Sequence, residues 1–374
     1  MSRVVSTGPG LGAQAGHAAM GALPRLMRTP FAALMAAVAA LLLTAALAAT
    51  LGAVSVQPED WLAPLRRWQT GDGDMLMGSA HVLWHIRLPR VLLALLVGGA
   101  LGLSGALTQG LFRNPLADPG LLGVSSGAAC ATALSLVLFA GLSSVPLPVA
   151  WRPYALPFVA FMGALGVCLT LDGLARWLTP GSISGLLLTG LAINALAGAV
   201  IGLATYLATD EQLRSLSFWT LGSVASASWP IAGLMAVLLA VSTAWALKLT
   251  RALNALALGE AVASHVGIDL RQLRWQVIGL VALTCGAAVA WCGMIGFVGL
   301  LAPHLARTWI GPDQRSLLLL SMALGAWLLL TADTLARTLA IPAEIPVGIF
   351  TALLGGPVLI VMLRDLARRQ GAAA

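Results

Sequence analysis

The sequence contains very few charged residues. Asp, Glu, Lys and Arg make up 9% of its 374 residues, and 59% are hydrophobic, whereas a soluble domain carries about 25% charged residues. This scarcity excludes a soluble globular domain, and the high apolar content excludes a disordered chain. Strands with alternating polarity are also missing, which argues against a membrane β-barrel. The composition therefore predicts an all-α polytopic membrane protein.

Several functional motifs are absent as well. Lys248 is the only lysine, and no glycine-rich loop ends in Gly-Lys-Ser or Gly-Lys-Thr, so we expect no phosphate loop for ATP. The five histidines form no His-Glu-x-x-His zinc motif. His81 and His85 are four residues apart without a carboxylate at ligand spacing, so we interpret them as interfacial residues and predict no metal site.

Cysteine and positive charge give no sign of metal or nucleic-acid binding. The four cysteines contain no Cys-x-x-Cys pair and lie in or beside apolar runs, which is typical of small core residues; they are Cys130, Cys168, Cys285 and Cys292. The net charge of +7 comes from scattered arginines without a basic tract. Membrane topology explains that charge better than a nucleic-acid partner does.

Apolar runs long enough to cross a bilayer, about 20 residues each, predict about ten transmembrane helices. The eight clear runs are Phe31–Val54, Val91–Leu111, Gly120–Leu142, Ala155–Leu174, Gly185–Ala208, Ile231–Leu249, Leu317–Ala336 and Ile345–Leu363. Residues 275–310 are expected to hold two short passes, broken near Cys292 to Gly296. We predict one permease domain over residues 31–365.

The distribution of basic residues predicts that both termini are cytoplasmic. This orientation places fourteen of the 21 Lys and Arg residues inside and seven outside, as the positive-inside rule requires. Residues 1–30 then form a disordered cytoplasmic tail, and residues 366–374 a second tail. Two polar segments remain: 55–90 outside, with room for a short helix, and 250–274 inside, with the polarity of a docking surface.

Ionisable residues within spans are candidates for function, and this chain has few. Asp172 with Arg176, and Asp333 with Arg337, are pairs four residues apart, which places the partners on one helix face. Each pair is either a local ion pair at a span end or part of a functional site. No acidic or histidine relay is evident at mid-membrane, which argues against a proton-coupled transporter.

Small residues at four-residue spacing let helices approach closely in lipid. Gly98 with Gly102 and Gly198 with Gly202 have this spacing. Chance matches are frequent in so glycine-rich a chain.

Five blocks of sequence resemble one family. They are Arg87-Leu-Pro-Arg90 continuing to Gln109; Arg113-Asn-Pro-Leu-Ala-Asp118-Pro119 continuing to Gly127; Leu253-Asn254 to Gly259-Glu260; Gly296-Phe-Val-Gly299 to Pro303-His304 and Arg307; and Asp333 to Arg337 with Pro342-Ala-Glu344-Ile-Pro346 and Gly355-Gly-Pro357. Over residues 80–365 the chain resembles the FecCD-type permeases, the membrane subunits of bacterial ABC importers for iron-siderophores, haem and vitamin B12.

The resemblance implies a ten-helix permease in the bacterial inner membrane. It would form a homodimer with a pathway along the dimer axis, two cytosolic ATPase subunits below and a periplasmic binding protein above. The chain itself would be no enzyme and hold no cofactor, since ATP and Mg²⁺ bind to the ATPase. This implied helix number agrees with the ten expected spans.

The resemblance also assigns roles to residues. Arg87, Arg90 and Arg337 would receive acidic residues of the binding protein, which suits the bidentate pairing of arginine with carboxylates; snorkelling at the interface is the alternative. The cytoplasmic coupling residues would be Asn254, Leu258, Gly259, Glu260 and Arg271. His304 lies in a family motif and is interpreted as structural.

The segment from Asp210 to Ser223 resembles the haem-permease version of this region. Arg214 of both protomers would pair with the haem propionates, and Phe218 and Trp219 would offer flat apolar surfaces. Tyr206 and Asn194 are placed with them on the substrate pathway. A ferric siderophore or vitamin B12 is the alternative cargo. A secondary transporter and an intramembrane hydrolase are disfavoured by the missing relay and the missing catalytic constellation.

Overall fold

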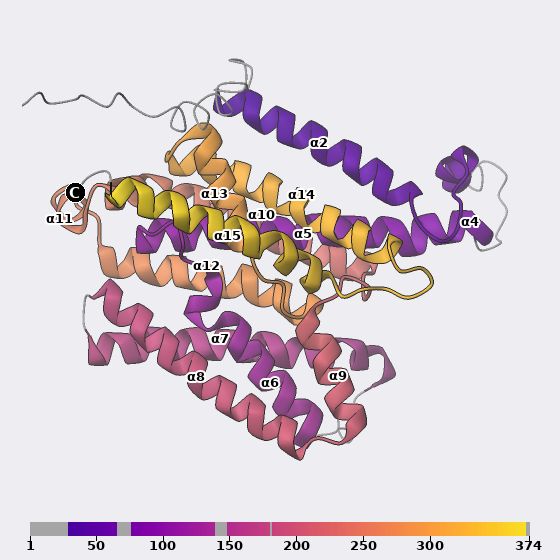
Figure 1. Cartoon of the computed structure of the whole chain (residues 1–374), viewed down its shortest axis with the longest axis horizontal. Helices are drawn as coiled ribbons and strands as arrows, with labels where there is room; N and C mark the ends of the chain where they lie inside the picture. Colours follow the sequence, from indigo (N-terminus) through magenta and orange to yellow (C-terminus); the bar gives the residue numbers. More distant parts are fainter. Residues whose placement is uncertain (1–28, 66–75, 139–147, 180–181, 372–374) are drawn as a thin grey trace, which may run out of the picture.

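The computed structural model describes residues 29–65, 76–138, 148–179 and 182–371, and these are helical without a β-strand, which confirms the all-α prediction. Its long helices are α2 (Pro30–Thr50), α5 (Leu88–Phe112), α6 (Val124–Leu138), α7 (Arg152–Leu178), α8 (Ile183–Leu207), α10 (Trp229–Ala257), α12 (Leu270–Cys292), α13 (Val298–Ile310), α14 (Gln314–Thr338) and α15 (Val347–Gly371) (Figure 1).

Short elements connect these helices. They are η2 (Pro58–Leu62), α4 (Gly78–His81), the π-helical η3 (Val82–Arg87), η4 (Pro119–Leu122), η6 (Val149–Trp151), α9 (Asp210–Leu221) and α11 (Glu260–His265). The predicted tail over residues 1–30 lies outside the described residues apart from its last two. At the other end, α15 continues past the predicted boundary at residue 365.

The predicted spans match the helices with two differences. Eight helices of the described ranges are long and apolar enough to cross a membrane, whereas α6 has 15 residues and α13 has 13. The predicted break between two passes is present, since α12 ends at Cys292 and α13 begins at Val298. The prediction that a span starts at Gly120 is wrong, because residues 119–122 form η4 and α6 begins only at Val124.

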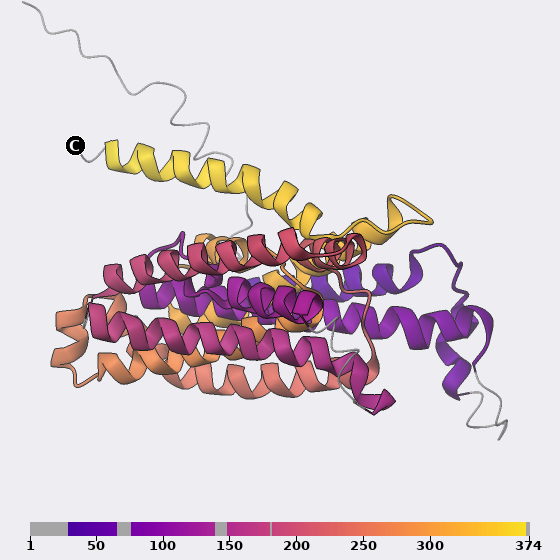
Figure 2. The ribbon, with the colours of Figure 1, turned by 90° about the horizontal axis from the view of Figure 1, so that it is seen from below.

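Helix α5 forms the centre of the bundle, and α10, α12, α13 and α14 pack around it (Figures 1 and 2). The continuous helical segment Gly78–Phe112 ends with α5, and 83% of its most apolar stretch is buried. The corresponding buried share is 22% in α15 and 28% in α8. A helix that is apolar on all sides belongs in the interior of a membrane bundle. The outer helices expose their apolar residues to lipid or to other subunits.

Helices α5 and α14 touch backbone to backbone. A Cβ atom at Gly98 would lie 2.4 Å from the carbonyl oxygen of Gly325, and one at Gly102 would lie 2.2 Å from that of Ser321. The first small-residue pair of the sequence is therefore a helix-packing site, as glycine spacing in lipid allows. The second pair, Gly198 and Gly202, has no neighbouring atom within 4 Å.

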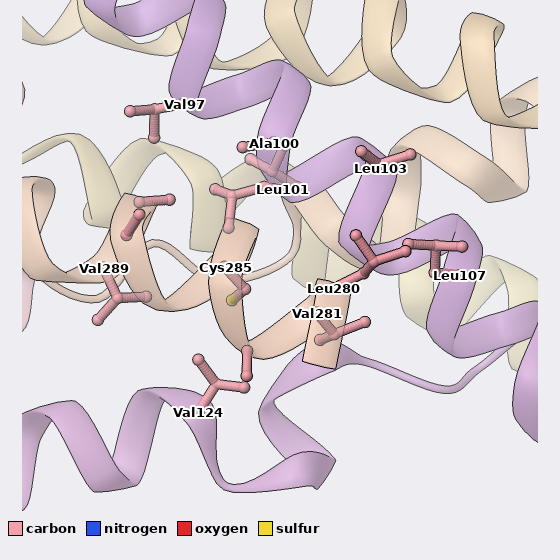
Figure 3. Packing of buried hydrophobic residues seen from close by; sticks show 14 of the residues in the cluster. Val97, Ala100, Leu101, Leu103, Leu107, Val124, Leu280, Val281, Cys285 and Val289 are labelled. Carbon is pink, nitrogen blue, oxygen red and sulfur yellow. The ribbon is translucent and has the colours of Figure 1, made fainter. Parts of the chain in front are cut away.

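The hydrophobic core lies between α5, α12 and α6. Figure 3 shows side chains of α5 meeting side chains of α12, with α6 contributing Val124; the labelled residues include Leu101, Leu103, Leu107, Leu280, Val281, Cys285 and Val289. The four cysteines are free, and three of them are buried. This confirms their interpretation as small core residues.

Replacing Gly102 with alanine should destabilise the protein by about 1 to 3 kcal/mol, the usual cost of forcing extra atoms into a packed interior. The added methyl group meets backbone of α14, which cannot move aside as a side chain can. The control is Gly233→Ala in α10, where no atom lies within 4 Å of the new Cβ. Thermal melting in detergent is the measurement. Equal melting of Gly102→Ala and Gly233→Ala would contradict the backbone contact.

Candidate functional site

Two of the three arginines expected to face a binding protein cap the end of α2. Arg87 donates hydrogen bonds to the carbonyl oxygens of Ala49 (3.2 Å) and Thr50 (2.7 Å) and to that of Val54. The last carbonyls of a helix have no partner within the helix and carry its negative dipole end, so guanidinium groups stabilise them. Arg87 is only 5% exposed.

Arg337 comes from the opposite side of the same helix end. It donates to the carbonyl oxygen of Leu51 at 2.7 Å and to that of Ala48. The last turn of α2 is thus held between the start of α5 and the end of α14. We call this end of the bundle the outer end, because the sequence analysis places it outside the cytoplasm.

Arg90 is the third arginine, and it binds two carboxylates of its own chain. Its Nε and Nη2 donate to Asp333 of α14 at 2.9 to 3.1 Å, and its Nη1 lies 2.9 Å from both oxygens of Glu344. Asp333 is buried, with 1% of its side chain exposed, whereas Glu344 has 47% exposed. Arg337 lies 3.7 Å from Asp333, so the predicted pair in α14 belongs to a larger network.

The three arginines therefore lie together at one end, but none is a free receptor. Each is bonded to carbonyls or carboxylates of this chain, and Arg87 and Arg90 are buried. A role in docking stays a prediction. It would require an incoming carboxylate to replace a partner that the arginine already has.

The other predicted pair is a local ion pair. Arg176 Nη2 lies 2.8 Å from Asp172 Oδ2 within the last two turns of α7. No further carboxylate or basic side chain forms an ion pair with these two residues in the described chain. It stabilises a span end, the first of the two roles considered for it.

A cavity of about 680 Å³ lies between the core and the outer helices. Its wall is mostly apolar and combines the middle of α5 and α12, the end of α9, the α12–α13 connection and one face of α15. The residues that line it include Leu101, Asp118, Leu221, Phe297, Ile349 and Leu353. Such a concave apolar space with few polar groups is the usual form of a small-molecule site.

Asp118 is a carboxylate that sequence reasoning missed in this cavity. The chain after α5 folds back, so that Pro119 packs on Gly299 beside the carbonyl of Leu101, near the midpoint of α5. Asp118 accepts a hydrogen bond from the Gly120 amide at 2.7 Å and caps η4. Asp-Pro-Gly reads as an ordinary turn, so its depth could not be predicted from the sequence. One carboxylate is not a relay, so the argument against a proton-coupled transporter is unchanged.

The residues predicted to meet the substrate lie on α9. The helix starts at a capping box of Thr209 and Gln212, and the Gln212 amide also donates to Leu136 of α6 at 2.9 Å. Arg214 is exposed and has no ion pair or hydrogen bond of its side chain in the described chain, and Phe218 is 60% exposed. Trp219 is half-buried against the core.

Two further residues predicted on the pathway have different surroundings. Tyr206 on α8 is 84% exposed. Asn194, on the same helix, donates to the carbonyl of Gly120 at 3.2 Å and accepts from the Ser126 hydroxyl. Its amide therefore holds the 118–123 turn against α8 rather than lining the cavity.

The predicted coupling segment forms a compact unit at the opposite, inner end. Glu260, the first residue of α11, lies 3.7 Å from Arg113 at the end of α5 and 3.8 Å from Arg274 of α12. Gly259 precedes it with φ at +126°, a conformation that side chains rarely adopt. Arg271 is exposed.

Three apolar side chains are exposed on the surface of this unit. Leu258 before α11, Val262 within it and Val266 directly after it are 75%, 42% and 64% exposed. The sequence analysis identified Leu258 but missed the two valines. Exposed apolar side chains gathered on one short segment are suited to contact another protein.

Asn254 ties the coupling segment to the start of α14. Its amide donates to Asp313 Oδ1 at 2.9 Å, and its oxygen accepts from the backbone amide of Gln314 at 2.9 Å. Burial raises the pKa of Asp313, but hydrogen bonds from Ser316 and Asn254 outweigh it and hold the pKa below its usual value. Asn254 is thus a structural link.

Comparison with known proteins identifies the family. Residues 40–365 match the FecCD transport family. The chain belongs to this family. It is 46% identical over 305 residues to the hemin transport system permease protein HmuU of Yersinia pestis. The aligned residues cover 81% of this chain and 89% of that protein. It is 40% identical over 307 residues to the vitamin B12 import system permease protein BtuC of Vibrio cholerae, covering 82% and 87%.

A solved structure shares the fold of this FecCD permease. It is described as an inward-facing conformation of a metal-chelate type ABC transporter, is 32% identical, and has a TM-score of 0.75 over 89% of this chain and 98% of that chain. The permease is therefore a multi-pass membrane protein, as the sequence analysis predicted.

No group of three metal-ligating side chains occurs in the described part of this FecCD permease. His81 and His85 stack with ring centroids 4.6 Å apart at the outer end. The two stacked rings have no third metal-ligating side chain beside them in the described residues. Their interfacial role stays a prediction.

The hydrogen bond between Asn254 and Asp313 should stabilise the permease by about 0.5 to 1 kcal/mol, since it involves a charged group but is exposed. Asn254→Ala and Asp313→Ala should each lower stability, and the double variant should lose less than the two together. Because the folded pKa of Asp313 is lowered, its contribution is complete above the unfolded value of about 3.9 and is lost as pH falls through the folded value. Additive losses in a double-mutant cycle would contradict this link.

Proposed function

We propose that this chain is the membrane subunit of a bacterial ABC importer for haem. It works as a homodimer in the inner membrane, with both termini cytoplasmic. It receives haem from a periplasmic binding protein, and ATP hydrolysis in two partner subunits drives transport.

Arg214 is the residue that most favours haem as the cargo. Its exposed guanidinium has Phe218 one helical turn away, and α9 continues into the wall of the cavity at Leu221. A cationic group beside apolar surface suits a flat ligand that carries carboxylates at one edge. The 46% identity to a hemin permease, against 40% to 41% to vitamin B12 permeases, favours the same cargo.

The exposed apolar face of α8 supports a homodimer. Its exposed residues are Leu188, Leu191, Leu196, Val200, Leu203 and Tyr206, and Gly198 and Gly202 leave open space between them. Small residues on a membrane helix let a second helix approach closely. In a homodimer built on this face, the Arg214 side chains of both protomers lie near the shared axis.

The inner unit supports a partnership with an ATPase. Leu258, Val262 and Val266 offer exposed apolar side chains for contact with a partner. Arg271 adds an exposed charge in the first turn of α12. Glu260 positions α11 through Arg113 and Arg274. Movement of α11 by the ATPase would therefore reach α5 and α12 directly.

Arg214→Ala should reduce haem uptake about tenfold, because one charge-assisted pair contributes about 1.5 to 3 kcal/mol when desolvated and less when exposed. The measurement is ATP-driven uptake into proteoliposomes that contain the permease, its ATPase and its binding protein. Arg152→Ala is the control, since Arg152 is an exposed arginine at the start of α7, away from α9. Wild-type uptake of cyanocobalamin or a ferric siderophore without haem uptake would refute the haem assignment.

Glu260→Arg should uncouple ATP hydrolysis from transport. It would place a third cation beside Arg113 and Arg274, and like charges at these distances repel. We expect uptake to fall to background while the permease still assembles with the ATPase, measured by co-purification. Glu260→Gln is the control and should retain part of the coupling. Normal uptake by Glu260→Arg would exclude a role for this contact.

A further inference from the structure

We propose that Glu344 is a positioning residue of transport: through Arg90 it holds the outer end of α15 in place, and a carboxylate of the docked binding protein replaces it. This inference rests on the proposed function, because it assigns an event at the outer end to docking. Glu344 belongs to the connection between α14 and α15, outside both helices.

The two carboxylates on Arg90 differ in how easily they can be replaced. Asp333 is buried with 1% of its side chain exposed, and two nitrogens of Arg90 bind it. Glu344 is 47% exposed and occupies only Nη1. Water and an incoming protein can reach Glu344 but not Asp333. An exchange at Arg90 would therefore remove Glu344 and leave the buried pair intact.

The charges of the outer end favour such an exchange. Arg90 and Arg337 pair with Asp333, and Arg90 also pairs with Glu344, while Arg87 bonds carbonyl oxygens of α2. If Glu344 left without replacement, Asp333 alone would pair with both Arg90 and Arg337, and uncompensated buried charge is costly. An incoming carboxylate would restore the balance. The surface therefore fits an acidic partner that arrives as Glu344 leaves.

Helix α15 is held to the bundle along a narrow strip. Its buried positions from the outer end are Val347, Thr351 and Gly355, spaced four apart, followed by Met362, and the Phe297 ring packs against Gly355. Figure 2 shows α15 separating from the rest of the bundle toward its C-terminal end. Because three of these four buried positions lie in the first nine residues of the helix, contacts near the outer end contribute most to holding it.

Only a few bonds accompany the Arg90–Glu344 pair at that outer end. The Ile345 amide donates to Ala336 and the Val347 amide to Gly222, each at 3.1 Å. The ion pair is the one contact among them that joins the connection to α5, the central helix. Its loss would free the connection from the buried central helix.

A change in α15 would alter the cavity. Gly348, Ile349, Ala352 and Leu353 form one wall, opposite Leu101 and Asp118. Displacement of the outer end moves this wall first, because Gly348 and Ile349 follow Glu344 within five residues. Docking would thus change the cavity before the ATPase acts.

The test is Glu344→Gln in the full importer. If Glu344 competes with the binding protein for Arg90, its removal should tighten docking about fivefold, the size expected for a half-exposed ion pair. Glu344→Asp, which keeps the charge, should return the affinity toward that of the wild type. The control is Glu59→Gln, an exposed acid of η2 at the same end without an ion pair in the described chain. Affinity of the cognate binding protein is measured by surface plasmon resonance on nanodiscs.

The second readout is the position of α15. The variant Leu353→Cys reports this position through its rate of thiol labelling, because Leu353 is 66% exposed. Labelling of the native cysteines in the protein without this substitution gives the background. In Glu344→Gln without binding protein, the rate should match that of the wild type with binding protein. A merely structural role of Glu344 would lower the melting temperature and leave docking unchanged or weaker.

Unchanged or weaker docking by Glu344→Gln, in a variant that still assembles, would overturn the proposal, as would tighter docking with no change in labelling. If Glu344→Gln fails to assemble, Glu344→Ala decides by the same two readouts, and docking no tighter than that of the wild type would overturn the proposal. Failure of haem uptake with both readouts as expected would refute the cargo alone.

Discussion

The backbone contact between α5 and α14 determines where the rest of the molecule lies. Gly98 and Gly102 bring α5 within van der Waals distance of Gly325 and Ser321, so neither helix can slide or rotate without a clash. In lipid this packing has no hydrophobic drive and depends on close fit. It places Arg90 of α5 beside Asp333 of α14 at one end and brings Gly110 beside Gln314 at the other. The polar contacts at both ends follow from it.

Those polar contacts are needed because the bilayer offers no water to helix ends. The last carbonyls of α2 would be unsatisfied near the membrane surface, and Arg87 and Arg337 supply their donors. Within the core, Ser104 of α5 and Thr284 of α12 bond at 2.7 Å, and Gln109 donates to Leu300 of α13 at 3.2 Å. Arginines that family resemblance associates with a partner therefore also hold this chain together, so a charge reversal there would test folding as much as docking.

Hydropathy predicted most of the fold because a span needs a long apolar run, and such a run is visible residue by residue. The break between α12 and α13 was predictable from alternation of the flanking charges. The start of α6 was not, since apolar residues after Pro119 read as one span although Asp118 turns the chain into η4. The network of Arg90 could not be predicted either, because Asp333 and Glu344 lie 243 and 254 residues away. Only the folded arrangement of α5 and α14 brings them together.

The two ends of α5 have the same construction. Arg90 at its start binds Glu344, which precedes α15, and Arg113 just after its end lies beside Glu260, which begins α11. In each case a carboxylate at or just before the start of a helix is attached to the buried central helix. Because α5 is buried along nearly its whole length, it is poorly suited to move itself, since packed interiors resist continuous deformation. In the proposed transport cycle, movement would be concentrated in α15 and α11, and α5 would be the fixed reference against which both shift. Signals between the two ends would then pass through α15 and the cavity wall rather than along the core.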